Sequence, residues 1–309
     1  MLPFKLIYHP GYDLNLGSHV FPAVKYRLIR ERLMNEGFAE FQDFEEPEQA
    51  SNEQVLLVHD PGWVSRLQEG RLSYPELLRL EIPYSRQTID AFWLAAGGTI
   101  KAARNALRDR IGCNVGGGFH HAFRAHGEGF CAINDIAIAI RTLQKDGCIE
   151  RALVIDCDVH HGNGTAAIFA NDPAVFTISI HQFDNYPSEK PPSSLDIDLP
   201  DLTGDDNYLR LLRKPYEAAL DSFKPNLVVF VAGADPYQED QLGGLSLTIG
   251  GLERRDSLVM EAALAHEAAV AVVLAGGYAA KLEDTVTIHC NTIKAANAVF
   301  RRACANQVL

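Results

Sequence analysis

The sequence predicts an α/β protein with a doubly wound, mostly parallel sheet and helices on both faces. Seven apolar runs alternate along the chain with longer segments in which apolar residues recur at helical spacing. The runs are rich in Val, Ile and Leu, which is typical of parallel strands that are buried on both faces. Because the chain has 309 residues of mixed composition, we expect a single domain over residues 1–309.

The expected strands follow the apolar runs in chain order: 4–9, 55–58, 111–116, 151–158, 174–181, 226–233 and 269–276. Helical spacing predicts helices over 22–36, 88–108, 133–145, 205–222, 250–267 and 281–300. Right-handed crossovers between parallel strands then carry these helices onto the faces of the sheet. The Pro-rich segment 186–192 is too short to divide domains, and we interpret it as a loop at the rim of an active site.

One expected strand runs directly into residue types that bind metals. The run 151–155 is followed by Asp156-x-Asp158-x-His160, and then by a glycine-marked turn. Residues two apart in an extended strand project to the same side, so these three side chains can share one face. An Asp at a strand end is also a common helix N-cap, so this segment alone leaves a structural role open.

Three further strand ends also carry polar side chains. The run from Ile111 opens into three glycines and the pair His120 and His121, while the runs 226–233 and 269–276 lead to Asp235 and Tyr278. Ligands bind beyond the carboxyl ends of the strands in open parallel sheets, so we expect the four strand ends to form one site. A phosphate-binding loop is disfavoured at the glycines, because no Lys-Ser/Thr pair follows them.

Together these motifs resemble the zinc-dependent histone deacetylase superfamily, in the same order and at similar spacing over nearly the whole chain. The resemblance implies an arginase/deacetylase-like fold with one catalytic domain. Segments 19–26, 114–118 and 240–246 are more similar to the class IV branch than to the others, so the chain is identified as a class IV-like bacterial member.

The resemblance also implies roles for individual residues. Asp158, His160 and Asp235 are the expected ligands of one Zn²⁺ ion, for which Fe²⁺ or Co²⁺ could substitute. His121 is the expected general acid/base, with Asn163 as its acceptor, and His120 is its electrostatic partner, with Asp156 as acceptor. Tyr278 is expected to donate to the developing oxyanion. The expected tunnel walls are Gly129, Phe130 and Tyr186.

Potassium is the second expected cofactor. The resemblance assigns an inner K⁺ site to Asp156, Asp158, His160 and Ser179 together with backbone carbonyls. A second alkali-metal site would use the carbonyls of Phe169 and Val175.

The predicted function is that of a metal-dependent amidohydrolase, which removes acetyl or longer acyl groups from lysine side chains or similar amines. An amidohydrolase of acetylpolyamines or other small molecules is the main alternative, because it would use the same site. A non-catalytic acyl-lysine-binding protein is less favoured, since no expected site residue is missing. A two-manganese ureohydrolase is disfavoured because Asp235 is followed by Pro236 and Tyr237.

Composition restricts the partners of the protein. The formal net charge of −12 argues against direct nucleic-acid binding and is compatible with an acylated lysine peptide, an acylated protein or an acylated polyamine.

The six cysteines contain no C-x-x-C pair, so we expect them to be reduced. No signal peptide or membrane-spanning segment is apparent, so we expect a cytoplasmic protein. The sequence does not indicate an oligomeric state.

Overall fold

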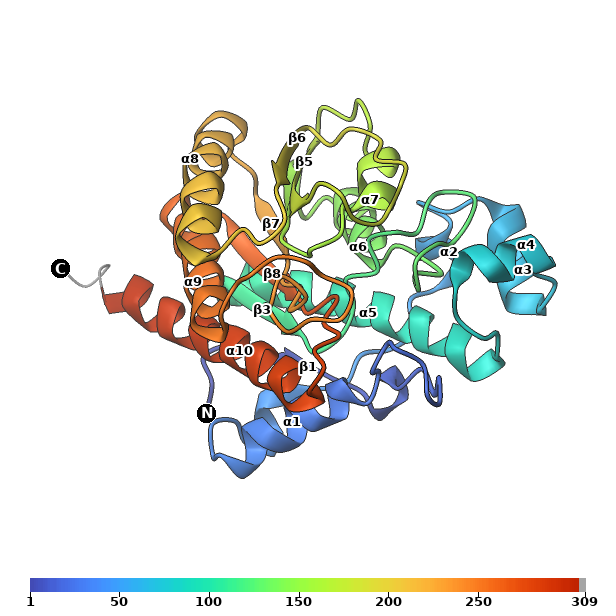
Figure 1. Cartoon of the computed structure of the whole chain (residues 1–309), viewed down its shortest axis with the longest axis horizontal. Coiled ribbons are helices and arrows are strands. Elements are labelled where there is room, and N and C mark those ends of the chain that lie inside the picture. Colours follow the sequence, from blue (N-terminus) through green and yellow to red (C-terminus); the bar gives the residue numbers. More distant parts are fainter. Residues whose placement is uncertain (306–309) are drawn as a thin grey trace.

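The structure, a computed structural model, describes residues 1–305. The last four residues of the expected domain, 306–309, lie outside the described residues. The strands are β1 (Leu6–Ile7), β2 (Phe44–Glu45), β3 (Ile111–Asn114), β4 (Ala152–Asp156), β5 (Val175–Gln182), β6 (Leu195–Leu199), β7 (Leu227–Val231) and β8 (Ala269–Val273). In the described part of the chain they form one eight-stranded sheet in the order β2-β1-β3-β8-β7-β4-β5-β6 (Figure 1).

Every pair of neighbouring strands within residues 1–305 runs parallel, which confirms the predicted fold class. The central strands are apolar and completely buried: β7 reads Leu-Val-Val-Phe-Val, and its five residues have no exposed surface. This is the composition expected of a strand that packs against helices on both faces.

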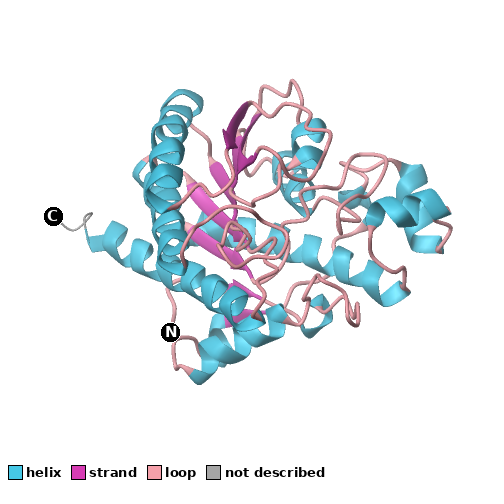
Figure 2. Ribbon diagram, viewed as in Figure 1, coloured by secondary structure: helices cyan, strands magenta, loops and turns pink. Residues whose placement is uncertain are grey.

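The helices are α1 (Lys25–Asn35), α2 (Asn52–Val55), α3 (Pro61–Glu69), α4 (Tyr74–Leu80), α5 (Arg86–Asp109), α6 (Asp135–Lys145), α7 (Asn163–Ile168), α8 (Asp205–Phe223), α9 (Ile249–Ala265) and α10 (Leu282–Ala305). Two 3₁₀ turns, η1 (Pro10–Tyr12) and η2 (Phe41–Asp43), precede and follow α1. Helices α8, α9 and α10 lie along one face of the sheet, and α5 and α6 lie on the other (Figure 2). None of the helices in residues 1–305 is long and apolar enough to cross a membrane.

Local sequence explains where the main helices begin. Ser85, Asn134 and Thr248 each precede a helix, and each accepts a hydrogen bond from a backbone N–H in the first turn. Such side chains satisfy a donor that would otherwise have no partner. All six expected helices are present, and their boundaries differ from the predicted ones by a few residues.

The expected strand over 55–58 is wrong. Ser51 and Gln54 form a capping box, which starts the short helix α2 at Asn52. Val55 and Val58 are buried through this helix and the turn after it, so their apolar character reflects core packing and not a strand.

A second difference concerns the strand that carries the predicted metal ligands. Strand β4 ends at Asp156, so Asp158 and His160 lie in the following loop and not on one face of a strand. The edge strands β2 and β6 were not among the predicted strands. In β6, Leu195-Asp-Ile-Asp-Leu199 alternates between apolar and charged residues, a pattern that is typical of a half-buried strand.

All six cysteines lie within residues 1–305, and none forms a disulfide there. Cys113, Cys131, Cys157 and Cys290 are buried in the core.

Candidate active site

The candidate site lies at the carboxyl edge of the four central strands. Strands β3, β8, β7 and β4 are consecutive neighbours in the sheet, although they come from distant parts of the sequence. The loop after each one contributes at least one of the polar side chains expected from the sequence. Because parallel neighbours end at the same edge, the four loops converge.

Three ligand-type side chains form a buried cluster. The ligand atoms of Asp158, His160 and Asp235 all lie within 4.8 Å of one another. The His160 Nδ1 atom is 3.0 Å from Asp158 Oδ1 and 3.4 Å from Asp235 Oδ2. Backbone groups hold the carboxylates, since Asp158 Oδ2 accepts from the Gly276 N–H and Asp235 Oδ1 accepts from the Val159 N–H, both at 2.9 Å.

The donor set of this cluster fits a divalent cation. Asp235 is fully buried, and its Oδ2 atom has no hydrogen-bond partner among residues 1–305. Burial and the neighbouring Asp158 raise the pKa of Asp235 to about 7, so the two carboxylates need a positive charge between them to remain ionised together. Gly276 keeps this space open, because a Cβ atom at that position would lie 2.0 Å from Asp235 Oδ2. Two carboxylates and one imidazole are ligands that Zn²⁺, Fe²⁺ and Co²⁺ accept.

His120 lies beside the cluster and forms an ion pair with Asp156. Its Nδ1 atom is 2.7 Å from Asp156 Oδ2, and its Nε2 atom is 3.8 Å from Asp158 Oδ1. Although burial disfavours a charged ring, the attraction of Asp156 and Asp158 raises the pKa of His120 to about 9.

His121 contacts an amide at Nδ1, where His120 contacts a carboxylate. Its Nδ1 atom is 2.8 Å from Asn163 Oδ1, and the amide carries no charge. Burial, His120 and His160 together lower the pKa of His121 well below its usual value. The two adjacent rings, whose centroids are 4.0 Å apart, therefore differ in charge at neutral pH.

Tyr278 is buried near the cluster, with its ring centroid 6.4 Å from that of His160. Its backbone N–H donates to Asp240 Oδ2 at 2.7 Å, and Asp240 Oδ1 accepts from two further N–H groups in its own loop. Burial and the nearby Asp158 raise the pKa of the phenol well above its usual value, so the hydroxyl remains a donor at neutral pH.

A narrow cavity of about 170 Å³ leads to these groups. Its lining includes Phe130, Tyr186, His121, His160 and Tyr278, together with Glu81, Gly129, Asn185 and Leu242. The ring of Tyr186 lies perpendicular to that of His121, at a centroid distance of 5.0 Å.

Gly129 is required at this narrow point. Its φ of +50° lies in the left-handed region, and a Cβ atom there would lie 2.8 Å from both His121 and Tyr186.

The four residues of the expected inner potassium site are neighbours, since Asp156 Oδ1 accepts from the Asp158 N–H at 3.1 Å and Asp158 Oδ1 lies 3.0 Å from His160 Nδ1. Asp156 and Ser179 are register partners on β4 and β5, so they lie side by side. The Ser179 hydroxyl forms a hydrogen bond with His181 Nδ1 at 3.0 Å. In the second expected site, the Phe169 carbonyl accepts from the Asp172 N–H, and Val175 begins β5.

Three groups near the site were not identified from the sequence in any functional role. Lys25 is completely buried, and its Nζ atom donates to the Ala275 carbonyl at 2.6 Å. Burial lowers the pKa of this amine to about 8, although the charges of Asp235 and Asp158 oppose the shift. Asp240 holds Tyr278, and Glu128 accepts a hydrogen bond from Asn163 at 2.6 Å. Lys25 and Asp240 lie in segments 19–26 and 240–246, which carry the family resemblance, but their contacts could not be predicted because each partner is distant in sequence.

Comparisons with known proteins identify the family. Residues 19–293 match the histone deacetylase domain. The chain is 41% identical over 298 residues to an uncharacterised protein of Picosynechococcus sp., covering 96% of this chain and 99% of the relative. It is 32% identical to a probable deacetylase of Archaeoglobus fulgidus, covering 88% of this chain and 80% of that protein, and 30% identical to histone deacetylase 2 of Arabidopsis thaliana, covering 89% and 74%.

A solved structure supports the same assignment. The crystal structure of the HDA15 HD domain superposes with a TM-score of 0.80 at 25% sequence identity, covering 94% of this chain and 90% of that one. The predicted superfamily is thus confirmed, whereas the class IV assignment stays a prediction. From the domain match and these relatives, the chain belongs to the histone deacetylase family.

Proposed function

We propose that the protein is a metal-dependent amidohydrolase that removes acetyl groups from lysine side chains or similar amines. The observation that carries this proposal is the buried cluster of Asp158, His160 and Asp235 at the end of a narrow cavity, with two histidines of unequal pKa beside it. Zn²⁺ is the proposed ion, held by these three side chains. When bound, it would polarise the substrate carbonyl and acidify a water molecule.

The protein groups would divide the proton transfers. His121 donates its Nδ1–H to Asn163, so its Nε2 lone pair is free to accept a proton from water and to return it to the leaving amine. His120, held by Asp156, keeps a positive charge next to the reacting centre. The Tyr278 hydroxyl would donate to the substrate oxygen as negative charge develops on it.

The cavity supports an acylated alkylamine as substrate. Phe130 and Tyr186 provide aromatic walls for an alkyl stem, and a volume of about 170 Å³ is below the roughly 300 to 1,000 Å³ of common ligand pockets. Acetyl is therefore the main proposed acyl group, and longer chains would need room beside Gly129 and Cys131.

An acetylated polyamine is the second candidate substrate. The side chain of Glu81 lines the same cavity and could attract a second ammonium group on such a molecule. The inner potassium site at Asp156, Asp158, His160 and Ser179 and the second site at Phe169 and Val175 remain proposals of the family resemblance.

Purified protein stripped of metal by a chelator would test the function. The apoprotein should show no hydrolysis, and one equivalent of Zn²⁺, Fe²⁺ or Co²⁺ should restore cleavage of acetyl-lysine peptides or acetylpolyamines. The Asp235→Ala variant is the matched control, because it should neither bind the ion tightly nor recover activity. Full activity of the metal-free protein, or undiminished metal content in Asp235→Ala, would contradict the proposal.

A further inference from the structure

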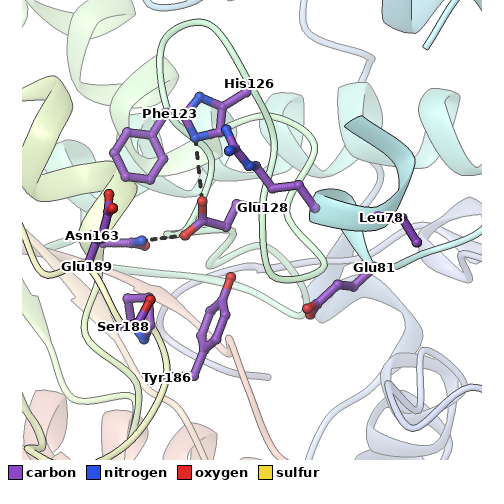
Figure 3. A pocket seen from close by; sticks show the side chains of 11 residues that line it. Leu78, Glu81, Phe123, His126, Glu128, Asn163, Tyr186, Ser188 and Glu189 are labelled. Carbon is purple, nitrogen blue, oxygen red and sulfur yellow. Dashed lines mark hydrogen bonds and ion pairs between the residues drawn. The ribbon is translucent and has the colours of Figure 1, made fainter. Parts of the chain in front are cut away.

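Glu128 lies one residue before Gly129 and lines a side cavity next to the tunnel. A tight turn fixes its backbone, since Glu128 and Cys131 exchange two backbone hydrogen bonds of 3.0 and 2.9 Å. The Glu128 carboxylate lies between the side chains of Asn163 and His126 (Figure 3). Its side chain is only 17% exposed, so these contacts are largely shielded from solvent.

The contacts determine which way the Asn163 amide faces. Asn163 Nδ2 donates to Glu128 Oε1 at 2.6 Å, while Asn163 Oδ1 accepts from the Gly164 N–H at 3.0 Å and faces His121 Nδ1 at 2.8 Å. An ionised carboxylate can only accept hydrogen bonds, so it selects the NH₂ end of the amide. The oxygen end must then face His121, which places the ring proton on Nδ1.

Two features favour an ionised Glu128. Burial alone would raise its pKa, but contacts with His126 and Asn163 hold the pKa below its ordinary value. His126 Nε2 lies 3.5 Å from the second carboxylate oxygen, Oε2. Without the carboxylate, Asn163 could rotate and offer its NH₂ group to His121, which would place the ring proton on Nε2 and leave no lone pair toward the substrate.

We propose that Glu128 is a positioning residue for the deacylation reaction, acting through the Asn163 amide to hold His121 in the tautomer that has a free Nε2. This inference rests on the proposed function. Glu128 does not line the tunnel cavity, so its effect on the substrate is indirect.

A second cavity gives access to Glu128 from outside the tunnel. This side cavity has a volume of about 450 Å³, and its lining includes Glu128, His126, Asn163 and Phe123. It lies next to the tunnel, with which it shares Glu81 and Tyr186. A small carboxylate in solution could therefore reach the space that a shortened side chain leaves.

The kinetic test compares three variants of the metal-loaded protein. Glu128→Ala should lower kcat roughly 10- to 100-fold, as is typical when the partner of a catalytic group is removed, with a smaller change in KM and unchanged metal content. Added formate should restore part of the lost kcat. Glu128→Gln keeps an acceptor oxygen and should lose less activity than Glu128→Ala. His126→Ala removes a neighbour that favours the ionised form of Glu128, so it should lower kcat, but less than Glu128→Ala does.

The Glu128→Ala and Asn163→Ala variants should also be combined. Because both residues act through one contact, the fold loss of kcat in the double variant should be much smaller than the product of the fold losses in the two single variants. Three results would overturn the positioning role. The first is a double variant whose loss equals the product of the single losses, and the second is an unchanged kcat in Glu128→Ala. The third is a fall in kcat that follows loss of metal and is not reversed by formate.

Nitrogen NMR of the His121 ring gives a measure that does not depend on turnover. The wild type should show a protonated Nδ1 and an unprotonated Nε2, and Glu128→Ala should show a mixture of tautomers. An identical tautomer in both proteins would overturn the inference even if activity fell. If the wild type hydrolysed no acylated amine, the proposed function would fail, while the NMR comparison would still test the contact.

Discussion

The two adjacent histidines differ because one is bonded to a carboxylate and the other to an amide. Asp156 stabilises the charged form of His120, whereas Asn163 can only fix the orientation of His121. The charge of its acceptor therefore favours a cationic His120, whereas His121, whose acceptor is uncharged, remains a neutral base. The family resemblance predicted this pairing, and the residue types predicted the unequal charges, since Asp and Asn differ in charge at neutral pH.

The first prediction concerns His121. Because it is the proposed proton carrier, His121→Ala should lower kcat by roughly 10²- to 10⁴-fold while the zinc content stays at one ion per chain. Steady-state kinetics with elemental analysis on the same sample would check this. Turnover close to that of the wild type with metal still bound would require another base, and His120→Ala serves as the comparison.

The second prediction concerns Tyr278. Tyr278→Phe removes only the hydroxyl, so it should lower kcat by roughly 10²- to 10³-fold and change KM little, as expected for a donor that acts mainly in the transition state. The ring still packs near Phe130 and Phe21, so the melting temperature should be almost unchanged. A large rise in KM with constant kcat would instead indicate a role in ground-state binding.

Positioning residues were harder to predict than ligands. Lys25, Glu128 and Asp240 each contact a residue from another segment of the chain, at separations of 250, 35 and 38 positions. Hydrogen bonds of this kind leave no periodic or motif pattern in the sequence. Their roles became apparent only from the distances in the folded protein.

At the scale of elements, the start of α6 depends on a buried histidine. His59 Nδ1 donates to the Phe123 carbonyl at 3.0 Å, and its Nε2 accepts from the backbone N–H of Asn134, the N-cap residue, at 2.9 Å. The Asn134 side chain also donates to the Ala122 carbonyl and to Thr165. This network joins α6 to the loop that carries His120 and His121.

The third prediction follows from the charge state of His59. Burial lowers its pKa from 6.5 to about 4, so the unfolded chain binds one more proton than the folded protein between these two pH values. The free energy of unfolding should therefore decrease as the pH falls through this window. From pH 7 to pH 5 this residue should account for about 2 kcal/mol of lost stability.

Urea denaturation of the wild type and of His59→Asn at both pH values would measure this contribution. The variant keeps a donor for Phe123 but cannot take up the proton, so it should be less stable at pH 7 and lose less stability on acidification. Equal losses in the two proteins would show that His59 does not titrate between its two states.

Apolar runs were a good guide to the central strands and a poor guide to short elements. The strand predicted at 55–58 is a helix and turn, because the capping box of Ser51 and Gln54 outweighs four apolar residues. Helices α2, α3, α4 and α7 have between four and nine residues, which is too few for a helical period to stand out.

At the scale of the whole molecule, sheet order accounts for the composition of the site. The class of fold could be predicted from the alternation of strands and helices, and the rule for parallel sheets predicted the edge that binds the ligand. The neighbour relations of β3, β8, β7 and β4 could not be predicted in this way, because they depend on long crossovers. These neighbour relations explain why four segments that are distant in sequence reach one cluster.

The fourth prediction concerns the range of acyl groups. Gly129 lines the tunnel and Cys131, two residues later, is small and buried, and each methylene of a longer acyl group that is buried against apolar atoms would contribute about 0.8 kcal/mol. We expect measurable hydrolysis of chains longer than acetyl. The kcat/KM values for acetyl, butyryl, octanoyl and myristoyl peptides would check this, and a steep fall from acetyl onward would contradict the tolerance without affecting deacetylation.

The position of the cluster between β7 and β4 has a consequence for folding kinetics. Asp158 and Asp235 are separated by 77 positions along the chain; the N–H of Val159, next to Asp158, orients Asp235, and the N–H of Gly276, from the loop after β8, orients Asp158. The register partners of β4 and β7, such as Asp156 and Val231, are 75 positions apart, and pairing of these strands brings the two ligands together. The ion should therefore bind a sheet that is already assembled, leaving the folding rate nearly constant and slowing the unfolding rate.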